Sequence, residues 1–126
     1  MTKTTIQPAG SAPAIGPYSP AVRVGDLLFS SGQIGIDPVT SQIIAGGIRA
    51  ETERVLQNLI LILKHEGLTM SHVVKTTVFM TNLAEFAAMN EVYGGHFPKD
   101  PPARTTVQVA ALPRGAAVEI EVIAHY

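Results

Sequence analysis

The sequence contains no cysteine among its 126 residues, which excludes disulfides, thiolate metal sites and a cysteine nucleophile. Positive charge is also scarce: 9 Lys and Arg stand against 10 Asp and Glu, and no basic run offers an electrostatic footprint for nucleic acid. No run of 18 apolar residues is present, and residues 1–20 lack an apolar segment of signal-peptide length. These absences predict a cytoplasmic protein that binds neither a membrane nor nucleic acid.

Apolar residues, by contrast, are abundant. Hydrophobic residues make up 46% of the chain and charged residues only 15%. A chain of this length favours one domain, residues 1–126, built around a single core. Because so small a domain cannot hide that much apolar surface by itself, we expect part of it to be buried between subunits.

The first half of the chain predicts a hairpin followed by a helix. Residues 7–20 are rich in Pro, Ala, Gly and Ser and predict an ordered but irregular lead-in segment. Residues 25–26 (Gly-Asp) separate two apolar runs, which is typical of a β-hairpin, and residues 37–47 predict a loop. Over residues 48–65 the apolar side chains follow a helical period, with Gly67 as the expected C-cap.

The second half predicts a strand, a second helix and two further strands. Residues 72–81 are rich in β-branched side chains, as strands are. Asn82, with Glu85 three residues later, predicts the start of a helix that ends at residues 94–95 (Gly-Gly). Two alternating runs follow, joined near residues 112–116. The predicted order is therefore β-β-α-β-α-β-β, an α+β fold with two helices on one face of a mixed sheet.

An arginine inside the first of these two final runs, Arg104, raises the question of what its charge pairs with. Side chains alternate across a strand, so Arg104 shares a face with Thr106. If the two final strands pair as a hairpin, Glu119 and Glu121 join them on the face away from the helices. A solvated ion pair explains this arrangement, and so does a crevice between subunits in which Arg104 holds a carboxylate ligand. From these residues alone, Glu119 and Glu121 are equivalent candidates.

Five segments carry a pattern that extends over essentially the whole chain: "AIGPYSPAV", "LFSSGQIGIDP", "ETERVLQNL", "VVKTTVFMTNLAEFAAMNEVY" and "PPARTTVQVAALPRGAAVEIEVIA". The most specific part is Pro-Ala-Arg followed, at fixed spacing, by an apolar-Glu-apolar triplet. Together these segments closely resemble the RidA/YjgF family of reactive-intermediate deaminases.

This resemblance implies a chorismate-mutase-like α+β fold that assembles as a homotrimer with three clefts between subunits. The residues themselves show no Gly-rich phosphate loop and no metal-binding spacing, so we expect an enzyme that needs neither a cofactor nor a metal. Members of the family hydrolyse enamines and imines of 2-oxo acids, such as 2-iminobutanoate and 2-iminopropanoate, and the products are the 2-oxo acid and ammonia.

The same resemblance assigns catalytic roles to three residues. The signature arginine falls on Arg104, which is expected to clamp the substrate carboxylate and so to orient the adjacent carbon. The signature glutamate falls on Glu119, which is expected to position or activate the hydrolytic water. Tyr18, in the Gly-Pro-Tyr motif, is expected to contact the substrate or its water.

Four further residues are implied as substrate-binding. Ser31 and Gly32 match a loop whose backbone groups approach the ligand. Thr106 stands where several relatives have cysteine, which removes thiol chemistry but leaves a backbone N–H for the carboxylate. Asn90 lies on the otherwise apolar stripe of the second helix, where a structural role is the alternative.

Two other functions are compatible with these residues. The same cleft could bind a 2-oxo acid or another small carboxylate without catalysis, although a binding site needs no base such as Glu119. Some relatives are described as ribonucleases that inhibit translation, but low basicity and the lack of an aromatic stacking platform argue against that here. The four histidines show no metal-binding spacing.

Overall fold

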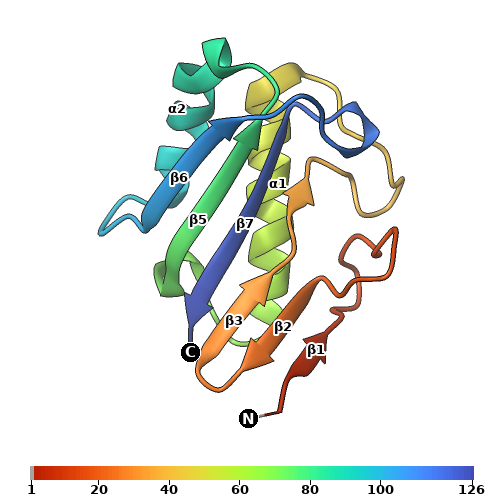
Figure 1. Ribbon diagram of the computed structural model, residues 1–126, viewed down its shortest axis with the longest axis vertical. Coiled ribbons are helices and arrows are strands. Elements are labelled where there is room, and N and C mark those ends of the chain that lie inside the picture. Colours follow the sequence, from red (N-terminus) through yellow and green to blue (C-terminus); the bar gives the residue numbers. More distant parts are fainter. Residues whose placement is uncertain (1) are drawn as a thin grey trace.

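Two helices lie against one face of a seven-stranded sheet (Figure 1). A computed structural model describes residues 2–126 of the chain. The strands, in chain order, are β1 (Thr4–Ile6), β2 (Ala21–Val24), β3 (Leu27–Ser30), β4 (Gln33–Ile34), β5 (Val73–Met80), β6 (Ala103–Gln108) and β7 (Val118–His125). The helices are α1 (Gly47–His65) and α2 (Phe86–His96), and 3₁₀ turns span Met70–His72, Leu83–Glu85 and Pro113–Gly115. The predicted α+β fold is confirmed.

The sheet is mixed, as predicted. Its strands lie in the order β1-β2-β3-β7-β5-β6, and β4 also pairs with β7. Strands β5 and β6 run parallel, whereas the other pairs run antiparallel. The predicted hairpin is β2–β3, and Gly25 in its turn has a φ of 57°, a conformation that favours glycine. Strands β1 and β4 were not predicted, because two or three residues carry too little alternation to be recognised.

The predicted pairing of the last two strands is wrong. Strand β6 pairs in parallel with one edge of β5, and β7 pairs antiparallel with the other edge, so β5 lies between them. Val109 N–H donates to Met80 O, and Thr81 N–H donates to Ala117 O, which ties both flanking strands to the end of β5. Residues 109–117 therefore form a crossover and not a tight hairpin turn.

Helix α1 packs an apolar stripe onto the sheet, where the predicted period places it. The buried apolar residues of this stripe are Ile48, Val55, Leu56, Leu59, Ile62 and Leu63. Gly67 follows the helix with a φ of 74°; its N–H donates to Lys64 O, and Leu68 N–H donates to Leu63 O. This is a Schellman motif, so the predicted glycine C-cap is confirmed.

Helix α2 begins and ends later than predicted. Asn82 Oδ1 accepts a hydrogen bond from Ala84 N–H and caps a 3₁₀ turn, and α2 itself starts at Phe86. It also continues through Gly94 and Gly95 to His96. Neither helix of the described chain is long and apolar enough to cross a membrane.

Candidate functional site

Strand β6 is an edge strand of the sheet (Figure 1). Arg104 lies on its helix-facing side, because the guanidinium contacts Asn90 and Tyr93 of α2. It pairs with Thr76 on β5, and Thr76 is fully buried. The prediction that Arg104 and Thr106 face away from the helices is therefore wrong. The error follows from the assumed hairpin, because β6 takes its orientation from β5 and not from β7.

The Arg104 guanidinium is held by α2. Its Nη1 donates to Asn90 Oδ1 at 2.7 Å, and its Cζ lies 4.8 Å from the ring centroid of Tyr93 and 5.4 Å from that of Phe86. These three residues share one face of the helix because of their spacing. No Asp or Glu within residues 2–126 forms a salt bridge with Arg104. The described chain therefore holds this cation in place without neutralising its charge.

Thr106 follows Arg104 on the same face of β6. Its Oγ1 is buried and has no hydrogen-bond partner among the residues that the structure describes. An unpaired buried hydroxyl costs free energy, so Thr106 is a candidate hydrogen-bonding group for a ligand or a neighbouring chain.

Glu119 lies on the opposite face of the sheet, which the helices leave open. It pairs with Phe79, three residues after Thr76 on β5, and alternation therefore places Arg104 and Glu119 on different faces. Burial, reinforced by the negative charge of Glu121, raises the pKa of the Glu119 carboxyl. A raised pKa moves a carboxyl toward the range in which it can both accept and donate a proton.

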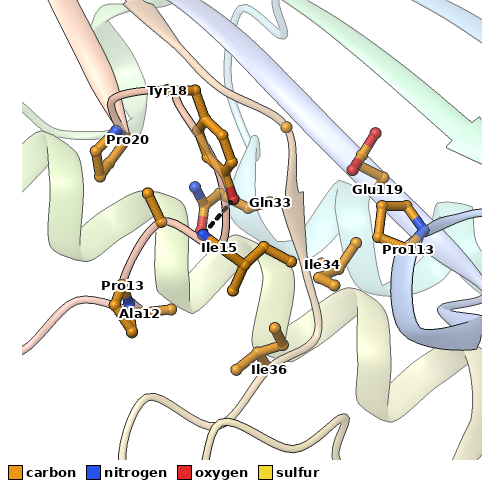
Figure 2. Close-up of a pocket in the computed structure, with 12 residues that line it drawn as sticks. Ala12, Pro13, Ile15, Tyr18, Pro20, Gln33, Ile34, Ile36, Pro113 and Glu119 are labelled. Carbon is orange, nitrogen blue, oxygen red and sulfur yellow. Dashed lines mark hydrogen bonds between the residues drawn. The ribbon is translucent and has the colours of Figure 1, made fainter.

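A cavity of about 50 Å³ opens beside Glu119 (Figure 2). Its apolar walls come from the lead-in segment, from the chain around β4 and from the crossover, and include Pro13, Ile15, Ile34, Ile36 and Pro113. Tyr18, Gln33 and Glu119 supply polar groups to the same cavity. The cavity therefore combines an apolar pocket with a carboxyl and a phenol.

Gly32 lets the backbone pass close to Glu119. A Cβ built on Gly32 would lie 2.7 Å from Glu119 Cδ, closer than side-chain carbons approach one another. Ser31, beside it, uses its polar groups within the chain: its N–H donates to Pro20 O at 2.8 Å and its Oγ to Ser19 O at 2.6 Å. Ser31 thus anchors the lead-in segment, and its contact with a ligand stays a prediction.

Tyr18 lies on the wall of the cavity and is 47% exposed. Its hydroxyl oxygen accepts a hydrogen bond from Ile15 N–H at 3.2 Å, which restrains the ring (Figure 2). This bond uses only an acceptor lone pair, so the phenol O–H can still donate to a ligand or water.

The predicted site residues form two groups in the structure. The cationic group consists of Asn90, Arg104 and Thr106. The acidic group consists of Tyr18, Ser31, Gly32 and Glu119. A surface ion pair between Arg104 and Glu121 is excluded, because Glu121 pairs with Thr77 on the open face. One chain does not bring the cationic and acidic groups together.

Sequence reasoning missed two residues next to Arg104 as members of the site. Thr76 Oγ1 and Tyr93 Oη are 2.7 Å apart in a buried hydrogen bond. The spacing of Tyr93 from Asn90 puts both on one helix face and was a usable signal. Nothing in a β-branched strand distinguishes Thr76 from its neighbours. No three His, Asp or Glu side chains within residues 2–126 are grouped to hold a metal ion.

Comparison with known proteins shows what the chain is similar to. Residues 9–126 match the family described as Endoribonuclease L-PSP. A 2-iminobutanoate/2-iminopropanoate deaminase from Mus musculus is 48% identical over 98% of this chain and 89% of its own length. The crystal structure of RidA from the Antarctic bacterium Psychrobacter sp. PAMC 21119 has a TM-score of 0.94 at 42% identity, covering 98% of this chain and 99% of that one. The crystal structure of E. coli TdcF with bound serine has a TM-score of 0.91 at 37% identity, covering 98% of each chain.

Proposed function

The chain belongs to the L-PSP endoribonuclease family, also called the RidA/YjgF family, and from this membership we propose that it is a cofactor-free deaminase. Its proposed substrates are 2-iminobutanoate, 2-iminopropanoate and their enamine forms, which it hydrolyses in the cytoplasm to 2-oxo acids and ammonia. The relative from Mus musculus is named for these two substrates.

The observation that carries this proposal is the unneutralised charge of Arg104. A guanidinium held by one amide and two aromatic rings keeps further N–H donors in a fixed fork, which matches a carboxylate. Every 2-imino acid has a carboxylate next to the reacting carbon, so this contact orients that carbon. The crystal structure of E. coli TdcF holds a serine, which likewise has a carboxylate beside its amine-bearing carbon.

In this proposal Glu119 carries the proton. A water oxygen bonds to C2 of the protonated imine while Glu119 takes one water proton, and the π electrons of the C=N bond move to nitrogen. Glu119 then gives the proton to that nitrogen. The C–N bond breaks, ammonia leaves, and the hydroxyl proton is lost to water as the C=O bond forms. The raised pKa of Glu119 supports both transfers.

The separation of the cationic and acidic groups supports a site shared between copies of the chain. Arg104 lies on an edge strand and Glu119 on the open face, so the edge of one copy has to reach the open face of another. That face carries exposed apolar side chains, Leu27, Phe29 and Val107, whose burial is favourable. An edge-to-face contact joins two different patches and can close into a ring. We propose that the ring is a homotrimer with three clefts.

A coupled assay tests the proposed function. A threonine dehydratase releases 2-iminobutanoate, and the formation of 2-oxobutanoate is followed with and without this protein. We expect the protein to accelerate this step, and we expect Glu119→Gln to lose the acceleration while still binding 2-oxobutanoate in calorimetry. Binding without acceleration by the wild-type protein would establish the alternative of a non-catalytic carboxylate-binding protein. If the wild-type protein neither binds 2-oxobutanoate nor accelerates its formation, both the deaminase function and the carboxylate-binding function are refuted.

A further inference from the structure

A buried pair of hydroxyl groups lies next to the Arg104 guanidinium. Thr76 Oγ1 and Tyr93 Oη are 2.7 Å apart, Thr76 is fully buried and Tyr93 is only 5% exposed. Thr76 is also the register partner of Arg104 across β5 and β6. Resting on the proposed carboxylate clamp, we propose that Tyr93 and Thr76 are positioning residues that fix the plane of the Arg104 guanidinium before a ligand arrives.

The hydroxyl bond tethers the Tyr93 ring at both ends. Its Cα belongs to α2, and its hydroxyl is bound to a residue of the sheet, so the ring cannot pivot about its own bonds without breaking that contact. Phe97 supports the ring, with the two centroids 4.8 Å apart and the planes tilted by 41°. The ring face that Arg104 contacts at 4.8 Å is therefore held in one orientation, within the range of cation–π attraction.

Asn90 supplies the second constraint on the guanidinium. It lies three residues before Tyr93 on the same helix face and accepts from Arg104 Nη1. A ring fixes the guanidinium plane, and an acceptor at Nη1 fixes its rotation within that plane. The remaining donors then point in a set direction, so binding a carboxylate immobilises less of a long, flexible side chain.

A purely structural role would also explain the hydroxyl pair, because each hydroxyl satisfies the other in the core. The double variant Tyr93→Phe/Thr76→Val separates the two roles. It removes both hydroxyls while keeping the side-chain shapes, so no buried polar group is left unpaired and the fold is preserved. The single variant Tyr93→Phe strands the Thr76 hydroxyl and serves as the destabilised comparison.

Two measurements on the double variant test the proposal. Nitrogen relaxation of the Arg104 Nε–H reports guanidinium order in the ligand-free protein, and calorimetry reports affinity for 2-oxobutanoate. We expect lower Nε–H order and an affinity roughly threefold to tenfold weaker, at a melting temperature close to that of the wild type. Unchanged order and affinity would show that the pair is only structural.

Tyr126→Phe is the matched control. Its hydroxyl donates to Glu66 Oε1 at 2.6 Å, away from the cationic group, so its loss is expected to change neither Arg104 order nor affinity. If the wild-type protein binds no 2-oxobutanoate, the clamp itself is refuted. The relaxation measurement then still decides whether Tyr93 and Thr76 order the guanidinium, so the two failures are distinguishable.

Discussion

Replacing Gly32 by alanine tests how closely Glu119 has to be placed. The new Cβ would lie 2.7 Å from Glu119 Cδ and 2.9 Å from both Cγ and Oε2. Non-bonded carbon atoms prefer about 3.5 to 4.0 Å, so the carboxyl group has to move by roughly 1 Å. The atoms in the way belong to a partly exposed, flexible side chain, which can rotate while the backbone stays in place.

The fold is expected to tolerate this change. Gly32 is outside the positive-φ region, so alanine can adopt its backbone conformation. The loss of unfolded-state freedom stabilises the variant by about 0.4–1 kcal/mol. A displaced Glu119 rotamer costs about 0.5–1.5 kcal/mol, so the two effects nearly cancel. Activity should respond far more, because a misplacement of about 1 Å at a catalytic group costs on the order of 100-fold.

The assay compares kcat, KM and melting temperature for Gly32→Ala and the wild type. We expect kcat to fall on the order of 100-fold and KM to stay nearly constant, because Arg104 is undisturbed. Gly95→Ala is the control: a Cβ there meets nothing within 4 Å, so activity should persist. Wild-type kcat in Gly32→Ala would refute the placement argument, and loss of the fold would show that the close approach is structural.

Substitutions at three other residues probe the clamp, the carboxyl and the pocket wall. Arg104→Ala should stay folded and lose 2-oxobutanoate binding in calorimetry. Arg104→Lys keeps the charge without the planar fork and should restore little of that binding. Full binding by either variant would contradict the carboxylate clamp. Burial raises the folded-state pKa of Glu119, so the fold favours the protonated carboxyl. The contribution of this carboxyl to folding stability is therefore complete below about pH 4 and is lost as the pH rises through the folded-state pKa. Glu119→Gln should therefore melt higher than the wild type near neutral pH but not at low pH, and an equal difference at both would contradict the burial argument. Asn58→Ala removes the Nδ2 group that donates to Ile34 O and Ile36 O. Urea unfolding should show a free energy of unfolding lower by about 2–4 kcal/mol. A decrease below about 1 kcal/mol would be inconsistent with the energy expected for these two hydrogen bonds.

Local patterns predicted the helices and most of the strands, because their signals lie within a few neighbouring residues. The apolar stripe of α1, its Gly67 cap and the alternation along β7 can each be predicted from neighbouring residues alone. Which strands pair with one another, by contrast, does not follow from such local patterns. Both β6 and β7 alternate, and residues 109–117 are compatible with a hairpin or a crossover. The choice depends on β5 offering two free edges, which is a property of the assembled sheet.

The wrong pairing had a direct consequence for the site. It placed Arg104 on the same face of the sheet as Glu119 and Glu121, whereas the structure places it on the opposite face. The motif identified Arg104 and Glu119, but it did not indicate on which face of the sheet each side chain lies. The contacts of Arg104 with Asn90 and Tyr93 depend on how α2 packs across β6, so no local pattern in the strand indicates them.

Mixing two inactive variants tests most directly whether the cleft combines Arg104 of one subunit with Glu119 of another. Arg104→Ala and Glu119→Gln each lack one of the two groups. Equal amounts are unfolded together and refolded, and mass spectrometry checks for the proposed trimers that contain both subunits. Random assembly leaves both groups intact in about a quarter of the clefts, so the mixture should regain about a quarter of wild-type activity. Mixed trimers that stay as inactive as either variant alone would contradict the shared cleft.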